Sequence, residues 1–193
     1  IRTMAKKHDI IWMKSVDSTN NEAKRIISDI DNLSVLSALE QTAGRGQRGN
    51  QWHSTAGDNL LFSIVLKFSD KESLPSLQAK RHFILNEIAS LSVVKFLSSH
   101  GIRAEIKWPN DIYYDGHKLS GILINSTIKA NMMDTSIIGI GLNVNQLNFH
   151  DWPTHPISLK QITGKDYELQ PLLEQIAESI VAEVERLKKN SPA

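Results

Sequence analysis

Hydrophobic residues recur along the chain in two patterns, short apolar runs typical of strands and longer stripes typical of helices. The short runs predict five strands: Ile10–Val16, Leu33–Glu40, Asn59–Phe68, Ala104–Trp108 and Asp134–Asn145. Of these, Asn59–Phe68 is almost continuously apolar, which predicts a central strand covered on both faces. A further apolar stretch, Ile112–Ile124, contains Asp115-Gly116, a dipeptide that strongly favours a hairpin turn.

The first predicted helix follows Ser18-Thr19-Asn20. Thr19 and Glu22 have the spacing of a capping box, in which two side chains satisfy free backbone amides at a helix start. Beyond them the apolar residues lie three or four positions apart, which gives the helix one hydrophobic face. That face comprises Ala23, Ile26, Ile27 and Ile30.

Two longer helices are predicted further along the chain. One spans Ser73–His100 and ends before Gly101, a residue type common just after a helix C-terminus. Its apolar stripe comprises Ile84, Ile88, Leu91, Val94 and Leu97. The other spans about Pro171–Lys189, with a stripe of Leu173, Ile176, Ile180, Val184 and Leu187. The segment Asn148–Lys165 is rich in Pro, His and Thr and is expected to be an irregular connection.

The order of these elements favours an α+β fold. A strand, a helix, two strands, a helix, several strands and a last helix do not alternate as in a doubly wound parallel sheet. We therefore expect a mixed sheet with helices packed mainly on one face, in one domain covering residues 1–193. A length of 193 residues, 40% of them hydrophobic, suits a single sizeable core.

Composition narrows the functional classes. Lys and Arg number 22 against 21 Asp and Glu, which argues against a general nucleic-acid binder and predicts no DNA partner. The chain has no cysteine, so disulfides and thiolate catalysis are excluded, and its seven histidines lack metal-ligand spacing. We find no membrane-spanning apolar run and no signal-peptide pattern, and therefore expect a cytoplasmic protein without a membrane partner.

The segment from Gln41 to Trp52 has the least core-like composition of the chain. It holds three glycines within six residues and two arginines, a combination suited to close backbone approach and to clamping anions. Its Gly-x-Gly-x-x-Gly spacing matches a dinucleotide fingerprint, but Asn50–Asp58 is too short and polar for the helix which that motif requires. A solvated surface loop is the simpler alternative. We predict a loop that closes over an anionic small molecule.

The run Lys107-Trp108-Pro109-Asn110-Asp111 leads into the predicted hairpin. A two-residue turn at Asp115-Gly116 would pair Tyr114 with His117, Tyr113 with Lys118, and Asp111 with Ser120. Asp111, Tyr113, Lys118 and Ser120 would then share one face of the hairpin. Asp111 and Lys118 would be diagonal neighbours, about 7–8 Å apart. They form either part of a site or a surface ion pair of little energetic value.

Side chains of the strand that includes Ile137–Asn145 divide by face. Ile138, Ile140, Leu142 and Val144 alternate with Gly139, Gly141, Asn143 and Asn145. Glycines inside a strand often mark the close approach of a ligand or of another backbone. Close helix packing is the alternative for the glycines, but it does not explain the asparagines. Ser18-Thr19-Asn20 is likewise open to two interpretations, a helix N-cap or a group of ligand donors.

Taken together, these segments resemble the motifs of biotin–protein ligases in their usual order, between Val16 and Asn145. The matching segments are Ser18–Asn20, Gln41–Gly49, Trp52, Lys107–Asp111, Lys118–Leu123 and Gly139–Asn143. The resemblance implies a catalytic domain similar in fold to class II aminoacyl-tRNA synthetases. It also implies ATP-dependent, Mg²⁺-assisted conversion of biotin to biotinyl-5′-adenylate, followed by transfer to a lysine of a carboxylase's biotin carboxyl carrier domain.

The resemblance also implies roles for individual residues, carried over by position. Biotin would be held by Ser18, Thr19, Asn20, Gln41, Gly44, Arg45, Gly46, Gln47 and Lys118. The nucleotide would be held by Arg48, Trp52, Lys107, Asn110 and Asn143. Lys118 and Arg45 would neutralise the reacting anions, and Asp111 is hypothesised to orient or deprotonate the acceptor lysine. The resemblance assigns no metal ligands.

The chain departs from this family pattern in its loop and at its ends. Gln47 stands where many relatives carry an arginine, so we expect weaker retention of the adenylate. Only nine residues precede Ile10, so we expect no DNA-binding domain like that of relatives that double as repressors. The C-terminal β-barrel of many relatives is expected either to be lacking or to have been truncated, since the chain stops at Ala193. A lipoate or octanoate enzyme of the same fold and a non-catalytic biotin sensor are the alternatives. An edge strand of the sheet could pair two copies into a homodimer.

Overall fold

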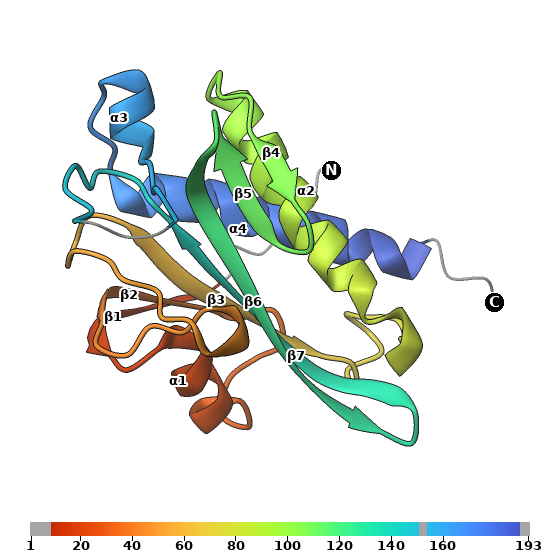
Figure 1. Cartoon of the computed structure of the whole chain (residues 1–193). Coiled ribbons are helices and arrows are strands. Elements are labelled where there is room, and N and C mark those ends of the chain that lie inside the picture. The colour runs from red at the N-terminus through yellow and green to blue at the C-terminus, as the bar shows by residue number, and fades with distance from the viewer. Residues whose placement is uncertain (1–8, 151–153, 190–193) are drawn as a thin grey trace, which may run out of the picture.

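A seven-stranded mixed β-sheet organises the protein, as the computed structural model of residues 9–150 and 154–189 shows (Figure 1). The strands are β1 (Ile10–Val16), β2 (Val35–Gln41), β3 (Leu60–Lys67), β4 (Glu105–Lys107), β5 (Asp111–Tyr114), β6 (His117–Lys129) and β7 (Met132–Leu142). Their order across the sheet is β1-β2-β3-β7-β6-β5-β4. The β1–β2 pair is parallel and the other pairs are antiparallel, which confirms the predicted mixed sheet.

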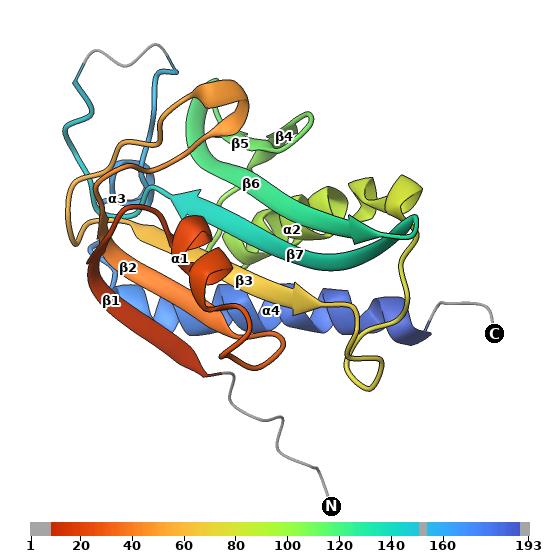
Figure 2. The same ribbon diagram turned by 90° about the horizontal axis from the view of Figure 1, so that it is seen from below.

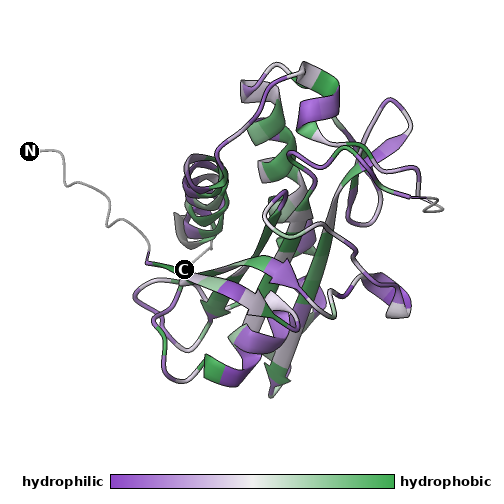
Figure 3. Ribbon diagram, turned by 90° about the vertical axis from the view of Figure 1, so that its left-hand side faces the viewer, coloured by the Kyte–Doolittle hydropathy of each residue, from purple (hydrophilic) through white to green (hydrophobic). Residues whose placement is uncertain are grey.

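The helices lie mainly on one face of this sheet, again as predicted. They are α1 (Thr19–Ile26), α2 (Phe83–Ser99), α3 (Leu159–Thr163) and α4 (Leu169–Lys189), with short 3-10 turns at Gln47–Gly49 and Ala79–Arg81. The two long helices, α2 and α4, pack on each other behind the sheet, and α1 lies on the opposite face (Figures 1 and 2). In Figure 3, where α4 is seen nearly end-on, its hydrophobic residues lie along one side.

Two hydrophobic clusters follow from this arrangement. The larger lies between the sheet and helices α2 and α4, and includes Phe62 and Ile176, both fully buried. The smaller lies under α1 and is built from Ala23, Leu36, Val65 and Ile137. Strand β3 contributes to both clusters, which confirms that it is central and covered on both faces.

The predicted start of the second helix is wrong, whereas its predicted stripe packs in or against the larger cluster except at Leu91. Helix α2 begins at Phe83, because the preceding segment bonds instead to the β6–β7 turn: the Met133 amide donates to the Leu77 carbonyl (2.8 Å) and the Ala79 amide to the Asn131 carbonyl (2.9 Å). The buried side of α2 includes Leu85, Ala89, Ser92, Val93, Phe96 and Leu97. Because α2 is apolar on most sides, the spacing of its apolar residues did not show which side is buried. Leu91 is therefore half exposed in spite of its place in the predicted stripe.

The hairpin prediction is right at the turn and wrong further along. Tyr113 lies opposite Lys118 as expected, but Asp111 lies opposite Gly121 rather than Ser120, because a β-bulge at Ile112/Tyr113 shifts the register. Ser120 is fully buried and donates its hydroxyl to the Gly141 carbonyl (2.7 Å). Strand β6 also runs on to Lys129, beyond the predicted end of the hairpin.

Smaller differences concern caps and connections. Ser18, not Thr19, is the N-cap of α1, and a capping box occurs instead at Ser158 and Gln161, where α3 interrupts the segment predicted to be irregular. Residues 151–153 of that segment lie outside the described residues. Helix α4 begins two residues earlier than predicted, and its predicted stripe lies in the larger cluster. A dimer through an edge strand stays a prediction. Among residues 9–150 and 154–189, no helix is long and apolar enough to cross a membrane.

Candidate functional site

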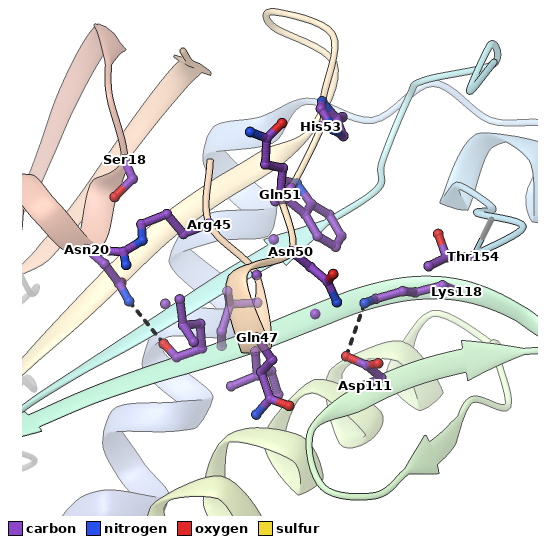
Figure 4. A pocket seen from close by; sticks show the side chains of 18 of the residues that line it. Ser18, Asn20, Arg45, Gln47, Asn50, Gln51, His53, Asp111, Lys118 and Thr154 are labelled. Carbon is purple, nitrogen blue, oxygen red and sulfur yellow. Dashed lines mark hydrogen bonds and ion pairs between the residues drawn. The ribbon is translucent and has the colours of Figure 1, made fainter. Parts of the chain in front are cut away.

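A cavity of about 610 Å³ lies where the start of α1, the glycine loop (residues 41–52) and strands β6 and β7 meet (Figure 4). Twelve of the fifteen sequence-predicted site residues line it: Ser18, Thr19, Asn20, Gln41, Arg45, Gly46, Gln47, Arg48, Trp52, Asp111, Lys118 and Asn143. The fold therefore brings segments from distant parts of the sequence into one site.

One end of the cavity is formed by the first turn of α1 and the end of β2. The Ser18 hydroxyl caps the helix by accepting from the Asn21 amide (3.0 Å). The backbone amide of Thr19 donates to Gln41 Oε1 (2.8 Å), which fixes the orientation of the Gln41 side chain. The Gln41 side-chain nitrogen is then the atom left to bond to a ligand. Ser18 and Thr19 are almost fully buried, and Gln41 is half-buried. This end is therefore a rigid, small polar surface.

Asn20 fixes α1 to the sheet beneath this end. Its amide nitrogen donates to the Leu123 carbonyl (3.1 Å) and to Asn125 Oδ1 (2.9 Å) on β6. A Cβ at Gly139 would lie 2.3 Å from Asn20 Oδ1, so only glycine fits on β7 at this position. The interpretation of Gly139 as a helix-packing residue is thus right, although the packed side chain itself lines the cavity.

The glycine loop is held closed at its stem by backbone hydrogen bonds. The Trp52 amide donates to the Gly44 carbonyl (2.9 Å), and the Gly46 amide donates to the Asn50 carbonyl (2.7 Å). A Cβ at Gly44 would lie 2.4 Å from the Trp52 carbonyl oxygen, which explains the glycine there. The tip is a 3-10 turn in which Arg48 has a left-handed backbone (φ 53°) and is exposed.

The indole of Trp52 lies on a floor made by two glycines. A Cβ at Gly141 would lie 2.5 Å from the indole, and one at Gly121 would lie 3.0 Å from it. The indole Nε1 is buried and has no hydrogen-bond partner among the described residues. Gly141 therefore marks a close approach, as predicted, but the group that approaches is a protein side chain.

Three cationic side chains line the cavity, two from the glycine loop and one from β6. Lys118 Nζ lies 3.2 Å from Asp111 Oδ1 and 5.8 Å from the centroid of the Trp52 ring, and Figure 4 shows the ion pair. Arg45 is exposed, and its Nη1 lies 3.4 Å from Asn21 Oδ1. With Arg48, the described lining has three cationic side chains and one carboxylate, Asp111. Such a balance suits a ligand with several negative charges.

A second polar network supports α1 next to Arg45. Asn21 donates to Asp17 Oδ2 (2.9 Å), and Arg25 forms an ion pair with Asp17 at 2.5 Å. The Arg25 hydrogen bond, followed by that of Asn21, holds the pKa of the Asp17 carboxyl well below its usual range. Asp17 therefore remains charged at all but strongly acidic pH.

Three predicted residues lie outside the lining of this cavity. Gly44 belongs to the loop stem, as described above, and Lys107 is exposed with its Nζ 4.7 Å from the centroid of the Tyr113 ring. Asn110 is 1% exposed and donates its side-chain amide to the Ile122 carbonyl. Asn110 thus fixes the chain before β5, and its Oδ1 is buried without a described partner. Its role on the nucleotide side stays a prediction.

Several lining residues were not predicted. They are Asn50, Gln51, His53, Trp108, Pro109, Gly121, Ile122, Leu123, Ile140, Thr154 and Pro156. Most stand within or beside the recognised motifs, so the motifs could have been extended to find them. Thr154 and Pro156 had no such signal, because they come from the connection after β7.

That connection fixes the backbone of Lys118. The Lys118 amide donates to the His155 carbonyl (3.2 Å), and the Ile157 amide donates to the Lys118 carbonyl (2.9 Å). Asn143 completes the arrangement, since its Nδ2 lies 3.3 Å from the Lys118 carbonyl and 3.1 Å from that of Ile157. Its Oδ1 is buried without a described partner. Asn145, by contrast, is occupied by hydrogen bonds to the Tyr167 backbone.

No group of three or more potential metal-ligating side chains occurs within the described ranges. Mg²⁺ commonly takes only one or two protein carboxylates beside substrate phosphates and water. The described lining contains one carboxylate, Asp111, so most ligands of a Mg²⁺ ion there would be phosphate oxygens and water.

Comparison with known proteins bears on the identity of this site. Residues 12–143 match the biotin/lipoate A/B protein ligase family. The chain is 29% identical over 182 residues to the bifunctional ligase/repressor BirA of Bacillus spizizenii, covering 91% of this chain and 54% of that protein. It is 30% identical to the biotin–[acetyl-CoA-carboxylase] ligase of Paracoccus denitrificans, over 83% of this chain and 67% of that one. The chain thus spans about half the length of the first of these relatives.

A solved structure agrees with these sequence matches. The biotin protein ligase of Aquifex aeolicus in complex with biotin and ATP superposes with a TM-score of 0.76 and 31% identity. The match covers 95% of this chain and 73% of that one. The predicted fold, that of a class II synthetase-like ligase domain, is thereby confirmed.

Proposed function

The chain belongs to the biotin/lipoate A/B protein ligase family, and from that premise we propose that it activates biotin with ATP and transfers it to a carrier protein. The intermediate would be biotinyl-5′-adenylate, and the acceptor a lysine of the biotin carboxyl carrier domain of a carboxylase. One observation carries this proposal: a single cavity joins a rigid polar end to cationic side chains of the glycine loop and of β6.

The polar end suits the ring of biotin. Gln41 Oε1 already accepts from the Thr19 amide, so Gln41 offers N–H donors to a ligand, and the cap at Ser18 leaves that hydroxyl's proton available. The carbonyl oxygen of a cyclic urea can accept such hydrogen bonds, whereas a dithiolane ring has no comparable acceptor. This donor arrangement favours biotin over lipoate or octanoate.

The cationic side chains of the lining suit the first half-reaction. A carboxylate oxygen of biotin attacks the α-phosphorus of ATP, a carbon–oxygen–phosphorus anhydride forms, and the bond to the β-phosphate breaks to release pyrophosphate. Both reactants are anions, so their approach requires cations at the reacting groups. We assign this role to Lys118, which would exchange Asp111 for the substrate carboxylate and α-phosphate, and to Arg45 and Arg48.

Mg²⁺ would neutralise phosphate charge when bound with ATP, and its ligands would be mainly phosphate oxygens and water, so its binding would not depend on Asp111. On the nucleotide side we propose Trp52 and Asn143, since the Nε1 of one and the Oδ1 of the other are buried without described partners. Closure of the glycine loop would keep water from the adenylate.

In the second half-reaction the neutral ε-amine of the acceptor lysine attacks the biotinyl carbonyl carbon. An amide bond forms, the bond to the phosphate oxygen breaks, and AMP leaves with that oxygen. The attacking nitrogen loses a proton, and we propose Asp111 as the group that orients or accepts it. Asp111 lines the cavity at one third side-chain exposure, which leaves it accessible from solvent.

The test is exchange of labelled pyrophosphate into ATP, with biotin, lipoate and octanoate offered separately. We expect exchange with biotin, and its loss in Lys118→Ala. Lys129→Ala is a matched control, because Lys129 lies on the same strand and also pairs with an aspartate, Asp134, at 3.1 Å, but does not line the cavity. This control should exchange normally.

The outcomes separate the alternatives. Exchange with lipoate or octanoate only would assign the chain to an acyl enzyme of another specificity within the family. Binding of biotin without exchange would indicate a non-catalytic sensor or a chain that requires further residues. Exchange that persists in Lys118→Ala would refute the role given to this lysine.

A further inference from the structure

A row of polar side chains crosses from the surface to the polar end of the cavity. It runs from Asn125 on β6 through Asn20 on α1 and Ser63 on β3 to Thr19. Asn125 is exposed, whereas Asn20 is 7%, Ser63 0% and Thr19 3% exposed. Ser63 does not line the cavity and belongs to none of the recognised motifs. A fully buried hydroxyl in the middle of a central strand therefore requires its own explanation.

The orientation of the Asn20 amide group is fixed by its neighbours. One of its two polar atoms lies 3.1 Å from the Leu123 carbonyl oxygen, which can only accept a hydrogen bond. That atom must therefore be the nitrogen, and the oxygen must face Ser63. Asn20 Oδ1 lies 2.6 Å from Ser63 Oγ.

A count of protons then determines the direction of the next two hydrogen bonds. Asn20 Oδ1 carries no proton, so the single hydroxyl proton of Ser63 lies in the bond to Asn20. Ser63 Oγ also lies 2.7 Å from Thr19 Oγ1, and this contact needs a proton as well. Only the Thr19 hydroxyl can supply it. Thr19 is therefore the donor to Ser63, and its oxygen presents only lone pairs to the cavity that it lines.

We propose that Ser63 is a positioning residue that fixes Thr19 as a hydrogen-bond acceptor, so that this point of the cavity selects a ring N–H of the substrate. The inference rests on the proposed function and deepens it. A cyclic urea offers such an N–H beside a carbonyl that suits the donors of Ser18 and Gln41. A ring oxygen or a carbonyl at the same point would face the Thr19 lone pairs. None of the four side chains in the row titrates, so this selection should not change with pH.

The test compares Ser63→Ala with Ser37→Ala in the complete chain. Ser37 is a matched control because it is equally buried on the neighbouring strand, and its hydroxyl donates to the Leu61 carbonyl (3.0 Å) without contacting the cavity. Urea unfolding of both variants measures the common effect of losing a buried hydroxyl. Calorimetric titration measures the affinity for biotin. We expect the Kd to rise about tenfold in Ser63→Ala and less than about twofold in Ser37→Ala.

Two further measurements separate hydrogen-bond direction from packing. The first uses two biotin analogues in which one or the other ring N–H is replaced by oxygen. The Kd of the poorer analogue divided by the Kd of biotin should fall about tenfold in Ser63→Ala. The Thr19 hydroxyl, no longer bonded to Ser63, can then donate a hydrogen bond to the ring oxygen of the analogue. The second repeats Ser63→Ala in a Thr19→Val background, where we expect less than about a twofold further change in the Kd of biotin.

Three results would overturn the inference. An unchanged biotin Kd in Ser63→Ala, an unchanged analogue ratio, or a full effect of Ser63→Ala in the Thr19→Val background would each show that Ser63 does not act through Thr19. Failure of the unsubstituted protein to bind biotin is a different result. It would refute the proposed function itself, and the inference with it.

Discussion

Replacement of Gly141 by alanine tests whether the packing of the Trp52 indole against β7 controls ligand binding. The added Cβ would lie 2.5 Å from the indole Cε2 and 2.8 Å from its Nε1. Carbon atoms in contact are normally about 3.5–4.0 Å apart, so the indole must move by roughly 1 Å. Strand β7 cannot yield, because it is paired along its length with β3 and β6.

The size of the effect on stability and on affinity depends on which part of the protein moves to relieve the overlap between the new Cβ and the indole. Overpacking a fixed site costs about 1–3 kcal/mol. Trp52 is only half-buried and stands at the end of a surface loop, so displacement of the loop relieves most of that strain. We expect the free energy of unfolding to fall by less than about 1 kcal/mol, equivalent to about 2–4 °C in Tm. The Kd for ATP should rise about 10- to 100-fold, since the nucleotide side of the cavity loses its indole wall.

Calorimetric titration with ATP and urea unfolding of the same samples would measure both quantities. Gly121→Ala provides a graded comparison, because its Cβ would approach the indole only to 3.0 Å and should have a smaller effect. In a Trp52→Ala background, Gly141→Ala should cause no further loss of affinity. A full loss in that background, or an unchanged affinity in the single variant, would refute the reasoning.

Three other predictions follow from the site. Asp111→Asn should abolish transfer to the carrier domain and leave pyrophosphate exchange within about threefold of the original rate; normal transfer in a single-turnover assay would contradict the role of Asp111. Gln47→Arg should slow release of the adenylate about tenfold through one added charge-assisted contact, as measured by filter retention, and equal release would show that this position does not bind it. Because the folded-state pKa of Asp17 is depressed, its pairing with Arg25 stabilises the fold above the unfolded-state pKa and is lost as pH falls from about 5. Urea unfolding of Asp17→Asn should therefore show a shallower loss of stability between about pH 5 and 3, and parallel curves would argue against the pairing.

The sequence predicted the structure most accurately where neighbouring residues alone determine the local conformation. Strand β3 was identified because a continuous apolar run permits only a strand buried on both faces. The turn at Asp115-Gly116 was identified because both residues adopt positive φ, 47° and 77°, as a two-residue hairpin turn requires. In the site, twelve of fifteen residues lie in one cavity because the motifs of the family carry information on long-range contacts that composition and periodicity lack.

The errors arose where distant parts of the chain compete with the local pattern. The bulge in β5 depends on how that strand fits against β6, so no counting from the turn could place Asp111 opposite Gly121. Helix α2 begins late because the segment before it bonds to a turn about fifty residues away. Asn110 lies outside the lining of the cavity, because its side-chain nitrogen donates to the Ile122 carbonyl, a contact that the motif alone does not reveal.

The hydrogen bonds of His155 and Ile157 to the Lys118 backbone affect how the Lys118 ammonium can change its ion-pair partner in the cavity. Hydrogen bonds to both the amide and the carbonyl hold the main chain, so only the flexible side chain can change partner. Without substrate, the ammonium is balanced by Asp111 at 3.2 Å. In the proposed reaction, the substrate carboxylate would replace Asp111 beside an ammonium group whose main chain stays in place. The freed Asp111 carboxylate would then lie next to the bound acid, so that binding of the first substrate would prepare the group proposed for the second step.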